Sequence, residues 1–216
     1  KLQNLIDSIS AEPMTGTTGI GHTRWATHGA PCERNAHPHR DCTGTIAVAH
    51  NGIVENYVSL REKLKAEGHK FTSDTDTEVV AHLIEHYYAG DLLAAVASTL
   101  KELEGAFALT VVDQNEPEHL IAARKDSPLI IGAGEDENII ASDIPAVLEY
   151  TREIVVLHDM ELADVSADGI TVYDLELTQV TPEMMTVEWD LDAAEKGGYE
   201  DFMLKEIHEQ PTALRE

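Results

Sequence analysis

The residues most able to do chemistry gather early in the chain, in the stretch GIGHTRWATHG at residues 19–29. This stretch combines a guanidinium, an indole, two imidazoles and hydroxyl groups, with Arg24 near its centre. Arginine suits a carboxylate because its planar fork can hold both oxygens. A surface ion pair is the alternative for Arg24, and core filling is the alternative for Trp25. The density of polar neighbours favours carboxylate binding at Arg24.

A second candidate, His50-Asn51-Gly52, directly follows the apolar run at residues 45–49. A side-chain amide followed by a flexible glycine at a strand end can aim two N–H groups at one point. A developing oxyanion requires such a pair of donors. The same residues also form a common Asn-Gly turn, and from these three residues alone the turn is the preferred interpretation.

The third candidate is SDTDTE at residues 73–78, just before a predicted helix. Serine, threonine and aspartate are first of all capping residues and need no further function at a helix start. A carboxylate such as Asp76 could also hold a substrate ammonium. Both interpretations of Asp76 stay open at this point.

Histidines and cysteines within residues 28–42 raise the question of a metal site. Imidazole and thiolate are the ligands that zinc prefers. Their spacing is neither CxxC nor HExxH, and the intervening Pro31 and Pro38 fix the backbone without obviously converging the side chains. We therefore predict no metal site and no cofactor from this cluster, which consists of His28, Cys32, His37, His39 and Cys42.

Composition limits the possible partners. The 216 residues carry a formal charge of −25, from 40 acidic and 15 basic residues, which offers nucleic acid or an anionic membrane nothing to hold. No apolar run approaches the roughly 20 residues of a membrane helix. Cys32 and Cys42 are too few for a disulfide scaffold. We expect a soluble cytoplasmic protein.

Hydrophobic patterning predicts the elements that must position these residues. Apolar spacing predicts helices at the start of the chain, around Tyr57 to Leu64 with a stop at Gly68, and over residues 77–88, 92–103 and 199–210 with Pro211 beyond the end. Runs of β-forming residues predict strands, the later ones in antiparallel hairpins. These fall at residues 45–49, 106–112, 120–123, 129–132, 138–141, 153–157, 162–165 and 170–173. Without regular βαβ alternation, the pattern indicates an α+β layered domain.

Five motifs together resemble the class II glutamine amidotransferases. They are GHTRWATHG at residues 21–29, NAHPH at 35–39, HNGIVEN at 50–56, SDTDTEV at 73–79 and SPLIIG at 127–132. Within that group the chain is similar to the glucosamine-6-phosphate synthases, because Trp25 is followed by Ala-Thr-His. Residues 203–211 are also similar to the passage from glutaminase to sugar isomerase domain in those enzymes. Purine-pathway relatives carry a similar arginine motif.

The resemblance implies an N-terminal-nucleophile fold, an αββα sandwich of two stacked antiparallel sheets between helical layers. It implies hydrolysis of glutamine through a γ-glutamyl thioester on an N-terminal cysteine, whose own α-amino group acts as the base. The ammonia passes to fructose 6-phosphate in the isomerase domain, in hexosamine biosynthesis by a homo-oligomeric enzyme. We expect residues 1–198 to form the amidotransferase domain and residues 199–216 to begin the connection.

Carried over from the family, the site residues have assigned roles. Arg24 is expected to hold the α-carboxylate of glutamine and Asp76 its α-amino group. Thr27, His28 and Gly52 are expected to line the pocket.

The same resemblance assigns the oxyanion hole and a gate. The Asn51 side chain and the Gly52 backbone N–H are expected to form the oxyanion hole. Trp25 is expected in a mobile loop that closes over glutamine and gates ammonia passage.

The sequence also departs from the family at its start. Family members open with a strand similar to Cys-Gly-Ile-Val-Gly, and nothing here corresponds to it. We therefore expect the nucleophile, its base and a first strand to be absent, and the chain alone to be inactive. The alternatives are a catalytically silent glutamine-binding or regulatory domain, and the amidotransferase domain of a related class II enzyme.

Overall fold

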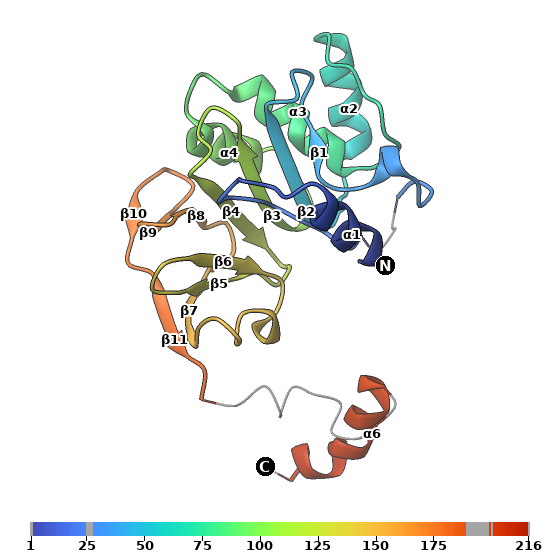
Figure 1. Ribbon diagram of the computed structural model, residues 1–216. Helices are drawn as coiled ribbons and strands as arrows, with labels where there is room; N and C mark the ends of the chain where they lie inside the picture. The colour runs from blue at the N-terminus through green and yellow to red at the C-terminus, as the bar shows by residue number, and fades with distance from the viewer. Residues whose placement is uncertain (1, 25–27, 189–198, 200, 216) are drawn as a thin grey trace.

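Two antiparallel β-sheets form the body of the protein, and three helices cover the outer face of the larger sheet (Figure 1). The structure, a computed structural model, describes residues 2–24, 28–188, 199 and 201–215. Every neighbouring pair of strands within the two sheets is antiparallel. This architecture confirms the predicted fold class of stacked antiparallel sheets.

The larger sheet has seven strands in the order β1-β2-β3-β4-β8-β9-β10. Its longest pairing joins β2 to β3 and places Asn51 opposite Ala108 and Gly52 opposite Phe107. The strands are β1 (His39–Arg40), β2 (Ile46–Val54), β3 (Gly105–Asp113), β4 (Leu120–Lys125), β8 (Leu162–Ser166), β9 (Gly169–Tyr173) and β10 (Gln179–Val180).

The smaller sheet has four strands in the order β11-β7-β5-β6. They are β11 (Glu183–Thr186), β7 (Glu153–Val156), β5 (Ile130–Ala133) and β6 (Asn138–Ala141). Its outer face carries a small apolar cluster around Val147, Ile154 and Val187. Within the described part of the chain, the one-turn 3-10 helix η2 (Ile144–Ala146) covers this face in place of the expected second helical layer.

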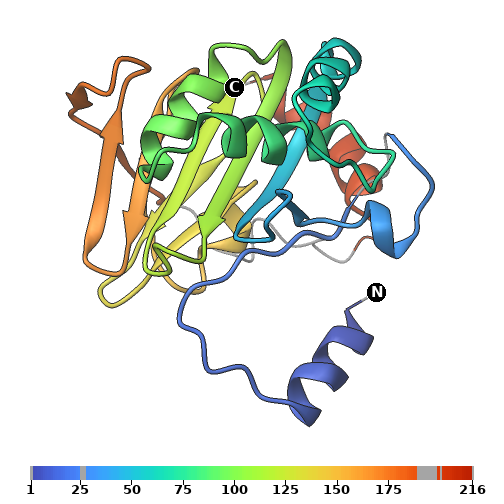
Figure 2. The same ribbon diagram turned by 90° about the horizontal axis from the view of Figure 1, so that it is seen from above.

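Helices α2 (Tyr57–Ala66), α3 (Thr77–Tyr87) and α4 (Leu92–Leu100) lie on the larger sheet, as Figure 2 shows from above. Asp91 starts α4 by accepting the backbone N–H of Ala94 at 3.0 Å, as an N-cap residue does. A further one-turn helix, η1 (Glu33–Asn35), precedes β1. Among the described residues, none of the helices combines the length and the apolar character needed to cross a membrane.

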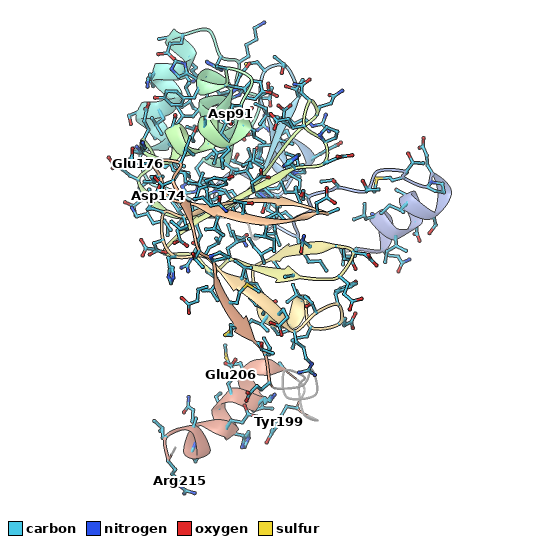
Figure 3. All side chains as sticks on the ribbon, turned by 90° about the vertical axis from the view of Figure 1, so that its left-hand side faces the viewer. Asp91, Asp174, Glu176, Tyr199, Glu206 and Arg215 are labelled. Atoms are coloured by element: carbon cyan, nitrogen blue, oxygen red, sulfur yellow. The ribbon has the colours of Figure 1, made fainter. Side chains whose placement is uncertain are left out.

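The two terminal helices, α1 (Gln3–Ala11) and α6 (Phe202–Ala213), project from the two-sheet body (Figures 1 and 2). No residue of α1 is buried. Figure 3 labels Tyr199, Glu206 and Arg215 on the α6 segment, away from Asp174 and Glu176 in the connection between β9 and β10.

Central strands are buried on both faces, which explains why they are apolar throughout. In β3, Phe107 and Leu109 belong to the core between the helices and the larger sheet. Ala108, between them, belongs to the core between the two sheets. Successive side chains of a strand point to opposite faces of the sheet, so the residues on both faces must be apolar here. Burying a side chain as large as Phe107 contributes about 1.5–3 kcal/mol.

Two predictions about the later elements need correction. The hairpin of β8 and β9 is confirmed, with Ser166 opposite Gly169. However, β7 pairs with β5 and β11 in the other sheet, so it forms no hairpin with β8. Pro211 lies inside α6 rather than beyond it. Proline has no N–H to donate to the carbonyl of Ile207, so α6 lacks one hydrogen bond near its end.

Candidate functional site

A cavity of about 290 Å³ opens where β2 runs past the start of α3. Four separate parts of the sequence line it, and each contains one of the motifs singled out above. The lining residues are His22, Arg24, His28, His37, His50, Asn51, Gly52, Ile53, Thr75, Asp76 and Thr77. The fold therefore brings Arg24, His28, Asn51, Gly52 and Asp76 together. Trp25 and Thr27 lie outside the described residues.

A larger hollow of about 700 Å³ lies between β6 and the segment at residues 17–21. Its ionisable groups are mostly carboxylates, and its histidine, His119, is bonded to Asp164 at 2.7 Å. Gly19, Ile20 and Gly21 of the first motif line it, but none of the candidate side chains does, since Arg24, Asn51 and Asp76 line the smaller cavity. The smaller cavity is therefore the candidate site.

Asp76 is a buried carboxylate, 3% exposed, in the residue just before α3. Its side chain makes no capping hydrogen bond to the helix. Instead Oδ2 accepts the backbone N–H of Val54 at 2.9 Å, while Oδ1 lies 3.7 Å from Nδ1 of His28. That Nδ1 atom is buried and has no hydrogen-bond partner among the described residues. The capping interpretation of Asp76 is therefore wrong, and its second oxygen is held beside the cavity.

The orientation of the Asn51 amide follows from its hydrogen bonds. The backbone N–H of Arg24 donates to Nδ1 of His22 at 2.9 Å, so this nitrogen carries no proton. The His22 proton is then on Nε2, which lies 2.5 Å from Oδ1 of Asn51. Because His22 donates to Oδ1, the donor atom Nδ2 of Asn51 has no protein acceptor among the described residues. The amide is thus oriented with its N–H groups available.

Gly52 is required by the backbone at this point of β2. Its φ angle is +130°, a region that side-chain-bearing residues rarely adopt. A Cβ atom here would lie 2.0 Å from the carbonyl oxygen of Ala106 on the neighbouring strand. The backbones of β2 and β3 therefore lie too close together at Gly52 to leave room for the Cβ atom of any other residue.

We expect Gly52→Ala to lower the free energy of unfolding by more than Gly44→Ala does. The alanine at 52 meets both an unfavourable φ and the Ala106 carbonyl, whereas Gly44 has φ +77° but no atom within 4 Å. The φ cost is about 1–3 kcal/mol in either variant, and the clash adds to it only at 52. Urea unfolding of both variants measures the difference. Equal losses would show that β3 moves aside without cost.

Arg24 holds the loop at the cavity mouth. Its Nη2 donates to the carbonyl oxygens of His28 at 2.6 Å and Gly29 at 3.1 Å, and its Nη1 donates to that of Ala30 at 3.2 Å. Arg24 itself has φ +43°, which is uncommon for a residue with a side chain. Of its five N–H donors, these contacts leave Nε–H and one Nη1–H for a ligand.

Histidines pack along one side of the cavity. His37 stacks on His22 with ring centroids 4.3 Å apart, and its Nδ1 accepts the backbone N–H of His50 at 3.2 Å. Nδ1 of His50 bonds to the Thr77 hydroxyl at 2.9 Å, and Nε2 of His39 bonds to that of Thr75 at 3.0 Å. These contacts tie β1 and β2 to the start of α3.

Burial keeps these imidazoles neutral. Burial, reinforced by neighbouring histidines, lowers the pKa of His37 to about 3. Burial also lowers the pKa of His50 to about 4, against an opposing effect of Asp76, and lowers that of His39. The cluster therefore supplies hydrogen-bonding groups near neutral pH rather than positive charge.

Stability should fall as the pH drops from 7 to 5. In this range the unfolded chain protonates histidines with a pKa near 6.5, while His37 and His50 stay neutral when folded. The contribution of these two histidines to the free energy of unfolding is fully present above the pKa of a histidine in the unfolded chain. It is lost as the pH falls toward their pKa values in the folded protein. His37→Asn, which can keep an acceptor for the His50 N–H, should reduce proton uptake on unfolding by up to about one proton. Urea unfolding at pH 7 and 5 tests this, and an unchanged pH dependence in the variant would refute it.

Glu78 organises the loop that carries Asp76. Its carboxylate accepts the backbone N–H of Thr72 at 2.7 Å, and the backbone N–H and hydroxyl of Ser73 at 2.8 and 2.7 Å. Burial raises the pKa of Glu78, but the nearby His82 imidazole and the hydrogen bonds from Thr72 and Ser73 outweigh it and leave the pKa well below its ordinary value. Within the motif at residues 73–78, the Thr75 hydroxyl accepts the Glu78 N–H in the first turn of α3 at 3.4 Å, and the Glu78 carboxylate folds the loop before the helix.

Sequence reasoning missed the roles of His22, His37 and Glu78 in positioning Asn51 and Asp76. His22 contacts Asn51 across 29 residues and His37 contacts His50 across 13, separations that no local pattern reveals. The available signal was the density of histidines around residues 22–50. Such a density of histidines is compatible both with a zinc site and with a neutral hydrogen-bonded network, and the structure shows the network.

Comparisons with known proteins agree on one family. Residues 22–149 match the family described as glutamine amidotransferase domain. The chain is 54% identical over 216 residues to glutamine–fructose-6-phosphate aminotransferase (isomerizing) from Clostridium tetani and from Aquifex aeolicus. The alignment covers 100% of this chain but only 36% of the length of each of these relatives.

Solved structures give the same picture of the fold. The glutamine phosphoribosylpyrophosphate amidotransferase from B. subtilis, complexed with ADP and GMP, aligns with a TM-score of 0.59 and 27% identity. The alignment covers 73% of this chain and 35% of that chain. A structure described as the allosteric regulatory enzyme of purine biosynthesis aligns with a TM-score of 0.62, 26% identity and the same two coverages.

Proposed function

Because the chain belongs to the glutamine amidotransferase domain family, we propose that its 290 Å³ cavity binds L-glutamine and presents the side-chain amide for hydrolysis. The observation that carries the proposal is the meeting of Arg24, Asp76 and Asn51 in one cavity. These groups match the three polar ends of glutamine: an α-carboxylate, an α-ammonium and a side-chain carbonyl.

Asp76 is suited to the α-ammonium. Its Oδ1 lies beside the cavity and is not used by the Val54 N–H, which binds the other oxygen. The unpartnered Nδ1 of His28, 3.7 Å from Oδ1, leaves a polar gap that an ammonium can fill. An ammonium with three N–H donors satisfies the carboxylate and adjacent acceptors together. Charge-assisted hydrogen bonds of this kind are among the stronger ones in proteins.

Arg24 is suited to one oxygen of the α-carboxylate, through either the Nε–H or the Nη1–H that the loop carbonyls leave free, because these two groups point to different sides of the guanidinium. The carbonyls of His28 and Gly29 hold the guanidinium in place through Nη2. A pre-positioned guanidinium loses less conformational entropy on binding than a mobile one. Roles for Thr27 in the pocket and for Trp25 in a closing loop stay predictions of the sequence.

Asn51 and Gly52 are suited to the developing oxyanion. The His22 bond to Oδ1 fixes the amide, so Nδ2 is pre-oriented before substrate arrives. Pre-oriented donors stabilise transition-state charge without reorganising during the reaction. The Gly52 backbone N–H is the second proposed donor, next to Asn51 in the same strand.

The covalent step needs a thiolate at the glutamine carbonyl. Neither Cys32 nor Cys42 belongs to the cavity lining, so neither is assigned this role. We assign it to the N-terminal cysteine that the family resemblance implies. The thiolate attacks the amide carbonyl, ammonia leaves, and water then hydrolyses the thioester to glutamate.

For the protein as a whole, we propose the reaction named for the 54% identical relatives, which use glutamine and fructose 6-phosphate. The glutaminase site would supply ammonia, and an isomerase domain would form glucosamine 6-phosphate for hexosamine biosynthesis. Residues 199–216 are then the start of the connection between the two. A homo-oligomeric parent in the cytoplasm completes the proposal. The purine-pathway alternative is less favoured, because the similarity to those structures is 27% or less.

Glutamate release tests the proposal. We expect a form of the protein that includes the family's N-terminal cysteine to release glutamate from L-glutamine, and its cysteine-to-alanine variant to bind L-glutamine without turnover. Turnover that survives the cysteine variant would contradict the thioester route. Tight binding of L-glutamine without turnover in the cysteine-bearing form would instead support a silent binding domain.

A further inference from the structure

Four side chains outside the glutamine cavity bring their ligand atoms together beside the second half of α3. Cys42 lies in the turn between β1 and β2, and His69 lies in the loop between α2 and α3. His82 and Glu85 lie three residues apart on α3. One atom from each of the four lies within 4.8 Å of every other. None of them lines the cavity described above.

Four of the distances between these atoms are 3.8 Å or shorter. The Cys42 Sγ lies 3.5 Å from Nδ1 of His82 and 3.8 Å from Nδ1 of His69. The Glu85 Oε2 lies 3.2 Å from Nδ1 of His82 and 2.8 Å from Nδ1 of His69.

Zinc coordination explains such spacings. Metal-ligand distances of about 2.3 Å to sulfur and 2.0 Å to nitrogen or oxygen place tetrahedral ligands about 3.3–3.5 Å apart. The distance from Cys42 to His82 falls at this value, and the other three would require shifts of about 0.1–0.5 Å. In the absence of a metal, protons must occupy the same space between the two imidazoles, the thiol and the carboxylate.

The surroundings hold these groups in the orientation that a metal needs. The backbone N–H of Lys70 donates to the Cys42 sulfur at 3.3 Å, and the backbone N–H of Cys42 donates to Oε2 of Glu85 at 3.1 Å. Such hydrogen bonds around the ligands orient them and tune their affinity. The His82 ring is 99% buried in its side chain and packs edge-on against Phe71 at 4.4 Å.

The remaining nitrogen of His82 adds an independent observation. Its Nε2 is buried without a hydrogen-bond partner, although Oε1 of Glu78 lies 3.8 Å away. Histidines that bind a metal through one nitrogen usually donate from the other to a carboxylate. A small shift of the ring toward Glu78 would complete that pair. The buried polar atom is thus accounted for by a metal on Nδ1 and a carboxylate partner on Nε2.

We propose that Cys42, His69, His82 and Glu85 form a structural site for a zinc-class divalent cation. All four positions are filled by protein groups, which is typical of structural rather than catalytic zinc. The ion would fasten the β1–β2 turn and the α2–α3 loop to α3, the helix that starts next to Asp76. This revises the sequence expectation of no metal site.

A second set of ligand-type residues, Glu67, His69 and His86, shares His69 with this site. It contains no thiolate and no fully buried ligand, and Glu67 and His86 already bond to each other at 3.2 Å. Since zinc favours thiolate and imidazole over exposed carboxylate, the site with Cys42 is preferred.

Cobalt(II) substitution of the complete 216-residue chain tests the site. We expect stoichiometric Co²⁺ to give a thiolate charge-transfer band in the near ultraviolet and strong visible bands typical of a tetrahedral centre. Zinc should displace it, and Cys42→Ala should remove the charge-transfer band and weaken zinc binding at least about 100-fold. The matched control is Cys32→Ala, which removes the other exposed cysteine and should change neither.

Further measurements distinguish loss of the metal site from misfolding of the Cys42→Ala variant. In the unmodified chain, zinc should raise the unfolding temperature and EDTA should reverse the rise. Zinc affinity should fall as the pH drops, because a thiol and imidazoles must lose their protons to bind the metal. His86→Ala should retain the cobalt band.

Several results would overturn the site. These are no cobalt band in the unmodified chain, a band that survives Cys42→Ala, or a band lost in His86→Ala. The proposal does not depend on the glutamine site, because loss of metal and loss of glutamine binding are measured separately.

Discussion

Asn51→Ala should lower kcat for glutamine hydrolysis by about 10²–10³-fold while leaving KM nearly unchanged. The reason is geometric. The His22 bond fixes Oδ1 of Asn51, so the amide Nδ2 is the group that can donate to charge developing on the substrate carbonyl. A donor used mainly in the transition state affects turnover more than binding. Steady-state glutamate release by the cysteine-bearing form measures both constants.

The matched control for Asn51 is Asn115→Ala. Asn115 bonds Asp113 at 3.0 Å in a loop outside the cavity, so its loss should leave kcat unchanged. If Asn51→Ala raises KM and spares kcat, Asn51 is a binding residue and the oxyanion assignment is wrong.

Asp76→Asn should weaken the use of glutamine by about 1.5–3 kcal/mol, or about 10- to 150-fold in kcat/KM. The change preserves the shape of the side chain and can keep an acceptor for the Val54 N–H, but it removes the charge facing the ammonium. Activity with free ammonia, if the complete protein has any, should be spared, because ammonia needs no clamp. Parallel assays with the two nitrogen sources measure this.

Asp74→Asn is the control for Asp76, two residues away. Asp74 is half-exposed and pairs with Arg34 at 2.5 Å, outside the cavity lining. We expect it to leave glutamine use unchanged. Equal losses in the two variants, or equal losses with glutamine and ammonia, would show that Asp76 supports the fold rather than the substrate.

The central helices and strands could be predicted from the sequence, because the local order of their apolar residues indicates which side chains are buried. Strands such as β3 are apolar on both faces, and α3 has an unbroken apolar period, so neither needed long-range information. Sheet membership did need it. The run at residues 153–157 has the same texture as β8, yet it pairs with β5, some 20 residues earlier in the chain, and with β11. Short strands at the sheet edges, such as β1 and β10, were missed for the same reason.

For the site, the motifs identified the segments that line the cavity but not the role of each side chain within them. The stretch at residues 73–78 has the composition of a helix cap, and only the structure separates Glu78, which folds the loop, from Asp76, which faces the cavity. The proposed metal ligands were hidden more completely. His82 lies 40 residues from Cys42, and its local pattern is that of an ordinary core position on α3.

The most direct test of the central claim is an NMR titration of the isotopically labelled chain with L-glutamine. If the cavity holds glutamine as proposed, the side-chain amide of Asn51 and the backbone N–H groups of Gly52 and Val54 should shift together and saturate at one affinity. Val54 reports on Asp76, whose carboxylate accepts its N–H. D-glutamine, which cannot place all three polar ends at once, should produce much weaker shifts. Saturable binding of L-glutamine that leaves these three signals unmoved, or equal shifts with D-glutamine, would contradict the account.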